Sequence, residues 1–409
     1  MNILYLNPSG NLGGAERSLL TLMAAVHSVR PSWVMNLVSS GEGSFVTEAK
    51  ALGIATTVLP FPPSLAALGD WSAGGSAGNG NRHATLTLMQ LCAAIPGVAA
   101  YIAKLRSVIN ATAPDIVHTN GFKMHILGRW SCPRGVPIIW HVRDYVGPRP
   151  LMSRLLRAHS SRAAAAIANS HSVAEDLRVS CNGRLRIFTI HNAVNLDRFS
   201  PTGPQLDLEA LAGLPRAKEG AIRVGLIATM ARWKGHEVFL RALSLLPRDL
   251  PILGYIISGP LYQTNGSQYS IEELRRSAAL LGLSSRVGFT GFLQDPAAAM
   301  RALDIVVHAS TQPEPFGLVI AEAMACRKAV IASAAGGATE IISPGIDALA
   351  HPPGDAVALA RSIQQLAVGA RMRTRLGKAG RATVERRFGL DRLTEALIPI
   401  YQSLAGSTS

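Results

Sequence analysis

Residues 1–26 read MNILYLNPSGNLGGAERSLLTLMAAV, and this stretch contains the unit from which the chain is built. The apolar run Ile3–Leu6 predicts a buried strand, and apolar residues at three-to-four spacing over Ala15–Val26 predict a helix. The glycine-rich segment Asn7–Arg17 connects the two. A strand, a glycine loop and a helix in this order are typical of βαβ folds with a parallel sheet.

The same alternation of apolar strands and amphipathic helices continues along most of the chain. Further strands are expected at Trp33–Val38, Ala55–Leu59, Ile116–His118, Pro137–His141, Ala165–Ala168, Ile222–Ile227, Ile252–Ile257, Arg286–Phe289, Ile305–His308 and Ala329–Ala332. A helix is expected at Val98–Ile109, between two of these strands. The pattern predicts an α/β protein with parallel sheets covered on both faces.

We expect two doubly wound, Rossmann-like domains, because the alternation pauses at Asn195–Gly220, where prolines and glycines gather. A chain of 409 residues also exceeds the size that one hydrophobic core usually serves. The expected boundaries are a first domain at 1–198, a linker at 199–218, a second domain at 219–385, and a C-terminal helix at 386–409 that packs back toward the first domain. Ligands of such domains bind outside the carboxyl ends of the strands.

The charge of the chain is strongly positive and uneven. The net charge is +14, and Lys123–Arg162 holds eight lysines and arginines against the single acid Asp144. Such a field attracts nucleic acid, an anionic membrane surface or phosphorylated small molecules, although solvated surface arginines without a partner would look the same. No zinc-finger spacing and no aromatic-interleaved basic repeat occurs, so nucleic acid is not an expected partner.

Four further features bear on the location of the protein. The N-terminal strand has no basic leader and is too short for the apolar part of a signal peptide. The uncharged stretch Ala84–Ala103 is long enough to span a bilayer, but Pro96-Gly97 interrupts it, so two short helical pieces are expected, packed in the core or dipping into a membrane surface. The polar segment Gly69–His83 is expected to be a mobile surface loop. The cysteines form no CxxC pair and are expected to be reduced, as in a cytoplasmic protein; they are Cys92, Cys132, Cys181 and Cys326.

The loop Asn7–Arg17 is the first candidate site. Gly13 and Gly14 allow close backbone approach, and the helix that follows presents unpaired N–H groups to an anion. The loop matches neither GxGxxG nor GxxxxGK[ST], so it favours neither NAD nor a P-loop. A tight turn without a ligand is the alternative.

The segments Met230–Glu237 (MARWKGHE) and Glu314–Glu322 (EPFGLVIAE) are the second and third candidates. In the first, Arg232 and Lys234 flank a tryptophan just before a helix and could clamp a diphosphate, unless they are merely exposed cations. In the second, an irregular loop leads into a helix, so that Glu314 could bind sugar hydroxyls and Glu322 a ribose. The alternative for Glu322 is an exposed helix residue, but its neighbours are all apolar.

Two histidines end predicted strands of the first domain and form the fourth candidate. They lie in His118–Gly121 (HTNG) and His141–Asp144 (HVRD). A histidine at a strand end can act in proton transfer or hydrogen bonding at a site, or can simply satisfy the backbone.

Together these segments resemble family 4 of the glycosyltransferases, the retaining group with the GT-B fold. The matching segments occur in the family's order; they are Gly13-Gly14-Ala15-Glu16, Asn169-Ser170, His191-Asn192-Ala193-Val194-Asn195 with Phe199, Trp233-Lys234-Gly235, Glu314 to Glu322 as the family's E-x7-E, and Gly336-Gly337-x-x-Glu340. The resemblance implies two Rossmann-like domains that face each other across a cleft. The N-terminal domain would bind the acceptor and the C-terminal domain the nucleotide sugar.

The resemblance also implies roles for single residues. The catalytic group would be His141, Glu314, Lys234 and Arg232. Donor contacts would come from Gly13, Gly14, Phe316, Gly317, Leu318, Val319 and Glu322, and acceptor-side candidates are His118, Asn120, Arg143 and Asp144. The family usually places its arginine five residues before the lysine, where this chain has Thr229, so Arg232 is expected to replace it.

The expected function is transfer of a hexose-type sugar, with retention, from a nucleotide-diphosphate sugar to a hydroxyl acceptor. No cofactor and no metal are expected, since the sequence has no Asp-x-Asp and cationic side chains can stabilise the leaving diphosphate. The expected acceptor is a sugar, a lipid-linked acceptor or a polysaccharide or glycoconjugate precursor, reached from the cytoplasm or at the anionic inner face of the cell membrane. The alternatives are a sugar-nucleotide epimerase or hydrolase of the same architecture, and a non-catalytic sugar-nucleotide-binding module.

Overall fold

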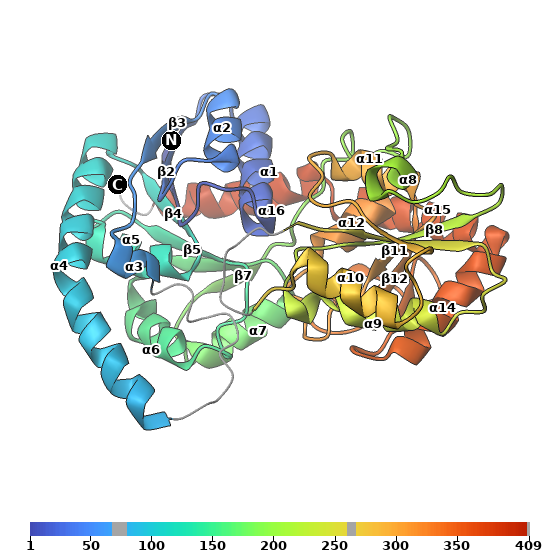
Figure 1. Ribbon diagram of the computed structural model, residues 1–409. Helices are drawn as coiled ribbons and strands as arrows, with labels where there is room; N and C mark the ends of the chain where they lie inside the picture. The colour runs from blue at the N-terminus through green and yellow to red at the C-terminus, as the bar shows by residue number, and fades with distance from the viewer. Residues whose placement is uncertain (68–79, 260–266, 407–409) are drawn as a thin grey trace. The chain divides into compact units, whose positions relative to one another are not determined.

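The computed structural model describes residues 1–67, 80–259 and 267–406 (Figure 1). Within it the chain forms two compact units, one made of Met1–Ala193 with Leu390–Ser409 and the other of Val194–Gly389. Most of Gly69–His83, the expected surface loop, lies outside the described residues.

The first unit is built on a parallel sheet of seven strands. Their order is β3 (Ala55–Val58), β2 (Val34–Ser39), β1 (Asn2–Asn7), β4 (Ile116–Asn120), β5 (Ile138–Val142), β6 (Ala165–Ala168) and β7 (Ile187–Thr189). Side chains alternate between the two faces along each strand. In β1, Ile3 and Tyr5 enter one core, whereas Leu4 and Leu6 enter the core on the opposite face.

Helices cover both faces of this sheet. The helices of the first unit are α1 (Gly14–Val29), α2 (Ser44–Ala51), α3 (Pro63–Ala67), α4 (Gly80–Thr112), α5 (Phe122–Ser131), α6 (Pro150–His159), α7 (His171–Ser180) and α16 (Leu390–Ala405). Helices α1 and α16 pack side by side over the face that carries Ile3 and Tyr5 (Figure 1). The last helix of the chain therefore completes the first core.

The second unit repeats this plan with six parallel strands. Their order is β10 (Val287–Phe289), β9 (Ile252–Ile257), β8 (Ile222–Ile227), β11 (Ile305–His308), β12 (Ala329–Ser333) and β13 (Leu349–His351). Its helices are α8 (Leu208–Ala212), α9 (His236–Ser244), α10 (Ile271–Leu280), α11 (Pro296–Ala302), α12 (Leu318–Ala325), α13 (Ala338–Ile341), α14 (Ala356–Val368) and α15 (Ala370–Arg387).

In each sheet, successive strands are added first on one side of the first strand and then on the other. The point at which the strand order reverses lies between β1 and β4 in the first unit and between β8 and β11 in the second. Ligands of doubly wound sheets bind outside the carboxyl ends of the strands at this point. Ligand-binding sites are therefore expected in the segments that follow these four strands.

The expected linker 199–218 is not a linker in the structure. It belongs to the second unit, where Phe199 and Leu208 are buried in the same core as Phe316. Gly213 ends the short helix α8 (Leu208–Ala212) within this stretch, but apolar residues of the stretch still pack in the core. The unit boundaries consequently fall at Ala193/Val194 and Gly389/Leu390, outside the expected limits of 219–385.

Helix α4 also differs from the expectation of two short pieces. It continues as one helix through Pro96, which removes only one intrahelical hydrogen bond between long helical stretches. Gly97 lets this part of the helix approach Pro62 and Ser64, since a Cβ there would lie 3.2 Å from the Ser64 Oγ. Within the described residues, no helix has both the length and the apolar character needed to cross a membrane.

Candidate functional site

In the second unit, the segments after β8 and β11 are joined by close backbone contacts. Gly235 has a φ of +77°, and a Cβ at this position would lie 1.9 Å from the carbonyl oxygen of Ala309. The backbone N–H of Thr311 donates to the carbonyl oxygen of Trp233 over 2.7 Å. Only glycine fits this approach, which holds Lys234 beside the end of β11.

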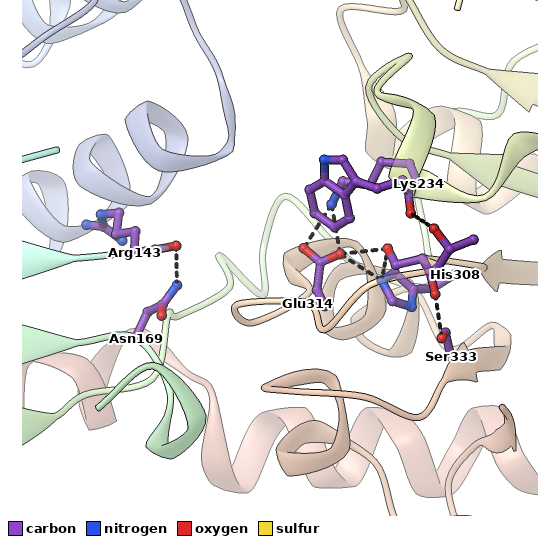
Figure 2. A network of polar contacts seen from close by, with 9 residues as sticks. Arg143, Asn169, Lys234, His308, Glu314 and Ser333 are labelled. Atoms are coloured by element: carbon purple, nitrogen blue, oxygen red, sulfur yellow. Dashed lines mark hydrogen bonds and ion pairs between the residues drawn. The ribbon is translucent and has the colours of Figure 1, made fainter. Parts of the chain in front are cut away.

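Lys234 forms an ion pair with Glu314. Its Nζ lies 2.8 Å from each carboxylate oxygen, so the ammonium donates to both (Figure 2). The Lys234 ammonium also lies over the Trp233 ring, 3.9 Å from its centroid. The lysine side chain is 19% exposed and the glutamate side chain 9% exposed, so this pair is largely withdrawn from solvent.

Two further donors contact Glu314. The Ser310 hydroxyl donates to its Oε2 over 2.8 Å, and His308 Nε2 lies 3.0 Å from the same oxygen. Because an ionised carboxylate only accepts, His308 must donate through Nε2–H. The Ser333 hydroxyl in turn donates to the carbonyl oxygen of Ser310 over 2.6 Å, which fixes this turn against β12 (Figure 2).

The protonation of Glu314 follows from these contacts. Burial by itself raises the pKa of this carboxyl, but the Lys234 ammonium and the His308 hydrogen bond outweigh burial and hold the pKa well below its usual range. Glu314 is therefore ionised at neutral pH. It can accept hydrogen bonds there but cannot act as a general acid.

The loop that carries Glu314 is also held by the glycine pair Gly336-Gly337. The Gly337 N–H donates to the Glu314 carbonyl oxygen over 2.7 Å, and a Cβ on Gly337 would lie 2.2 Å from the Pro315 carbonyl oxygen. Gly317, with a φ of +99°, then turns the chain into α12. The Gly336-Gly337 pair thus serves to position the loop.

Helix α12 carries the remaining residues expected to contact the donor. Its first turn contains Leu318 and Val319, both half-buried, and the amides of a first helical turn have no intrahelical partner. Phe316 is buried against Phe388, so its side chain serves the core and only its backbone can serve a ligand. Glu322 is 8% exposed, one turn into the helix, and is not the exposed surface residue of the alternative interpretation.

Arg232 has different partners from Lys234. Its guanidinium lies 2.8 Å from the Glu273 carboxylate and 4.4 Å from the centroid of the Tyr269 ring. Both members of the ion pair are nearly half exposed. The replacement of the family's arginine by Arg232 stays a prediction.

In the first unit, polar side chains meet where β1 and β4 end. Asn120 donates through Nδ2 to the Asn7 Oδ1 over 2.6 Å and accepts at Oδ1 from the Arg143 Nε over 2.8 Å. Arg143 also donates to the Asn192 Oδ1 over 2.7 Å. The carbonyl oxygen of Arg143 accepts from Asn169 over 3.3 Å (Figure 2). Segments distant in the sequence thereby join one network at the switch point of the sheet.

The glycine loop before α1 joins the same network. Glu16 is buried and accepts from the Gly13 N–H over 3.1 Å and from Asn7 over 3.5 Å. Gly14 does not have a positive φ, and a Cβ added to it would meet no atom within 4 Å, so the fold itself does not require glycine there. A ligand that approaches the backbone closely would require it.

The other residues expected in the first unit have protein partners. His118 and His141 are hydrogen bonded to each other over 3.0 Å and are both buried. Asp144 accepts from the Tyr145 N–H and forms an ion pair of 2.6 Å with Arg149. The acceptor-side candidates therefore belong to interconnected networks at the ends of β4 and β5.

Several members of these networks received no individual role from the sequence. They are His308, Ser310 and Ser333 around Glu314, and Asn7, Glu16, Asn192 and Tyr401 in the first unit; among these, Asn7, Glu16 and Asn192 lie within segments that the sequence did single out. For His308 and Asn7 a signal existed, since the first is the polar last residue of an otherwise apolar strand and the second directly follows the apolar run Ile3–Leu6. For Tyr401, which hydrogen bonds with His118 over 2.7 Å, no local pattern could reveal a partner 283 positions away.

Solved structures define the class of fold. The structure of Anabaena HepE in complex with UDP and glucose is similar with a TM-score of 0.79 and 26% identity, covering 98% of this chain and 100% of that chain. Sucrose-phosphate synthase from Thermosynechococcus elongatus is similar with a TM-score of 0.75 at 20% identity, covering 100% of both chains, which supports the fold alone. The protein has the GT-B fold, with two Rossmann-like units.

Family profiles and relatives identify the family. The family "Glycosyltransferase Family 4" matches residues 45–198 and "Glycosyl transferases group 1" matches residues 215–383. The lipopolysaccharide core biosynthesis mannosyltransferase LpcC of Rhizobium leguminosarum bv. viciae is 32% identical over 218 residues, 53% of this chain and 60% of the relative. A D-inositol 3-phosphate glycosyltransferase of Mycobacterium tuberculosis is 32% identical over 226 residues, 54% of this chain and 44% of the relative. The matches span about half the length of these curated relatives. The chain belongs to glycosyltransferase family 4.

Proposed function

We propose that this protein is a retaining glycosyltransferase that moves a hexose-type sugar from a nucleotide-diphosphate sugar to a hydroxyl acceptor. The observation that carries the proposal is the buried Glu314 carboxylate, paired with Lys234 at the switch point of the second sheet. Family membership and the likeness to HepE, whose structure was solved with UDP and glucose, support a sugar nucleotide as the donor.

The Lys234 ammonium and the Glu314 carboxylate are proposed to bind different parts of the donor. A sugar nucleotide brings a diphosphate, which attracts Lys234 and the N-terminal amides of α12. As Lys234 turns toward the phosphates, Glu314 loses its cation and becomes available to the hydroxyls of the donor sugar. The ion pair in the structure thus keeps both groups charged and oriented before the donor arrives.

The leaving diphosphate is stabilised by fixed positive charge. Negative charge develops on it while the anomeric carbon becomes cationic, and preorganised donors lower such barriers by several kcal/mol in a closed site. Lys234 and Arg232 are proposed to supply this charge, so that no metal is required. Gly14 is proposed to contact the donor through its backbone.

Glu314 is proposed to orient the sugar, without attacking it. Its two oxygens already accept from Lys234, Ser310 and His308, an arrangement suited to holding polar groups. Retention then follows from front-face transfer, in which a phosphate oxygen of the donor helps to remove the proton of the acceptor hydroxyl. Glu322, one helical turn further on, is proposed to bind the ribose.

The acceptor is proposed to be a sugar or a lipid-linked precursor at an anionic membrane surface. Helix α6 supports this, because it combines Arg154 and Arg157 with Leu151, which is 50% exposed. A helix with cations beside exposed apolar residues binds anionic lipid surfaces.

Two steps test the proposed function. A thermal-shift panel of nucleotide sugars comes first, because a bound donor raises the unfolding midpoint by mass action and the best stabiliser identifies base and sugar. The labelled donor is then incubated with and without candidate acceptors. Transfer that requires an acceptor is expected, whereas quantitative epimerisation or hydrolysis of the donor alone would establish the alternative enzyme class.

The substitution Glu314→Gln tests the central residue. It keeps the shape of the side chain but removes the charge, and transfer should fall by ~100-fold, as for other single electrostatic groups in active sites. The matched control is Glu219→Gln, an exposed position in the same unit. Turnover near that of the unmodified protein would refute the role of Glu314.

A further inference from the structure

The hydrogen-bonded pair of histidines at the ends of β4 and β5 has an internal direction. His118 Nε2 lies 3.0 Å from His141 Nδ1, and the two side chains are 0% and 2% exposed. Between two neutral imidazole nitrogens one must donate and the other accept. The distance alone allows either direction.

Arg143 fixes this direction. Its NH2 group lies 3.3 Å from the same His141 Nδ1, and a guanidinium has only donors. Nδ1 of His141 must therefore accept, which places a hydrogen on Nε2 of His118. The reverse arrangement would set an N–H of His141 against an N–H of Arg143.

Helix α16 fixes the other end of the chain of hydrogen bonds. With its hydrogen on Nε2, neutral His118 must accept at Nδ1, and the Tyr401 hydroxyl lies 2.7 Å away and can donate there. The hydroxyl of Tyr5, 3.5 Å from that of Tyr401, can donate to it in turn. Every bond in this chain then runs in one direction, from Tyr5 to His141.

The charges of the pair agree with this order. Burial, together with the nearby Arg143 guanidinium, holds the pKa of His118 and of His141 well below the ordinary histidine value. Burial also raises the pKa of the Tyr401 phenol, which therefore keeps its proton. Both imidazoles are neutral at physiological pH, and each has a single N–H.

One ring nitrogen of the two histidines takes no part in this chain of hydrogen bonds. His141 Nε2 is buried and has no hydrogen-bond partner among the described residues. It belongs to the side chain that precedes the last residue of β5, at the sheet edge where doubly wound folds bind ligands. A buried polar atom without a partner is costly unless a ligand pairs with it.

We propose that Arg143, His118 and Tyr401 are positioning residues that together fix His141 as the Nε2–H tautomer, so that His141 offers a hydrogen-bond donor to a sugar or phosphate oxygen of the substrate. The substrate in this statement rests on the proposed function. In this tautomer His141 stabilises oxygen atoms and cannot remove a proton through Nε2. His118, expected on the acceptor side, acts through His141 because both of its ring nitrogens already have protein partners.

The first test reads the tautomer directly. In the full-length protein labelled with 15N-histidine, the Nε2 of His141, assigned by loss of its signal in His141→Gln, should show the chemical shift of a protonated nitrogen and Nδ1 that of an unprotonated one. This measurement needs neither substrate nor activity, so it stands even if the proposed function fails. An unprotonated Nε2 would overturn the inference.

Variants test the origin of the tautomer. Tyr401→Phe removes the donor to His118 and leaves the longer Arg143 contact to hold the tautomer, so a second tautomer of His141 should become detectable. The matched Tyr5→Phe removes the hydroxyl that lies beside that of Tyr401 and should leave the His141 signals unchanged. Equal changes in both variants would show a merely structural effect and overturn the inference. His118→Gln can still accept from Tyr401 and donate to His141, so it should retain the Nε2–H signal, whereas His118→Leu, which keeps the Arg143 contact but no donor from position 118, should weaken it.

Substrate binding and turnover complete the test. The sugar nucleotide that stabilises the protein most should shift the His141 Nε2 signal; a shift with its nucleoside diphosphate alone identifies a phosphate oxygen, and a shift only with the intact donor identifies a sugar oxygen. Saturating donor without any shift would overturn the assignment of the partner. Tyr401→Phe should lower kcat by ~10–100-fold with little change in KM, less than the ~10⁴-fold loss when a catalytic base is held in the wrong tautomer.

Discussion

Replacing Lys234 by methionine isolates the electrostatic role of the ion pair at the centre of the proposed donor site. Methionine keeps the length and the apolar stem of lysine but removes the ammonium that lies 2.8 Å from both oxygens of Glu314. Glu314, only 9% exposed, would then retain the hydrogen bonds of Ser310 and His308 as its remaining compensation. Breaking a buried pair in this way leaves a charge without its partner.

The loss can be estimated from the burial of the two groups. Removing one member of a buried pair costs about 3–5 kcal/mol, and the lower end applies because Lys234 is 19% exposed. For a unit of this size each kcal/mol lowers the midpoint by about 2–4 °C, so ~3 kcal/mol corresponds to roughly 6–12 °C.

The effect should depend on pH with a definite sign. In the unmodified protein the lowered pKa of Glu314 contributes stability above the ordinary carboxyl pKa and loses it only as pH falls through the lowered value. In Lys234→Met the pKa of Glu314 rises, because burial is the largest effect on it. As pH falls, Glu314 is therefore protonated at a higher pH in the variant than in the unmodified protein, and protonation removes the buried charge that destabilises the variant. The difference in the free energy of unfolding between the unmodified protein and Lys234→Met should therefore be largest near about pH 8 and decrease toward about pH 4.5.

Thermal unfolding followed by circular dichroism across this pH range is the appropriate assay. Lys378→Met is the matched control, since it removes an exposed lysine from the same unit and should change the midpoint by little at any pH. A gap between Lys234→Met and the unmodified protein that stays constant from about pH 8 to about pH 4.5 would refute the reasoning.

Three further predictions concern the glycines and the charged surface. Gly235→Ala forces a Cβ to within 1.9 Å of the Ala309 carbonyl oxygen at a φ of +77°, and should lower the thermal midpoint and weaken donor binding together. Gly14→Ala meets no atom within 4 Å, so its midpoint should stay the same or rise, while its dissociation constant for the donor, measured by calorimetry, should increase ~10-fold or more; unchanged donor affinity would exclude a backbone contact there. The protein should sediment with anionic lipid vesicles at low salt and be released from them at high salt, and Leu151→Asp should reduce this binding. Equal binding to neutral vesicles would contradict an electrostatic contact with the membrane.

The central strands of both sheets were predictable because they are predominantly apolar runs. Ile222–Ile227 and Ile252–Ile257 were expected with the observed limits. The edge strands β7 and β13 were missed, since each has three residues that are mostly half-buried, and so few residues carry no periodic signal. Pro96 misled the prediction of α4 because local propensity cannot report the packing that sustains a helix on both sides of a proline.

The site was predictable where chemistry and glycine occur together in the sequence. Lys234-Gly235 and the Glu314 loop drew attention because a charged group beside an irregular loop is unusual. The sequence could not reveal that Lys234 and Glu314 form a pair, since 80 positions separate them. Buried neutral networks were harder still, because a histidine such as His118 looks the same whether it binds a substrate or orients a second histidine.

The return of α16 to the first unit has a consequence for the order in which the protein matures. Val194–Gly389 is one uninterrupted stretch and can fold while the ribosome is still producing the remainder. Residues 1–193, although made first, must wait for Leu390–Ala405 before the sheet face that carries Tyr5 is covered. The first unit to be synthesised is thus the last to be finished, and until Tyr401 emerges the first unit lacks the helix whose tyrosine hydrogen bonds with His118.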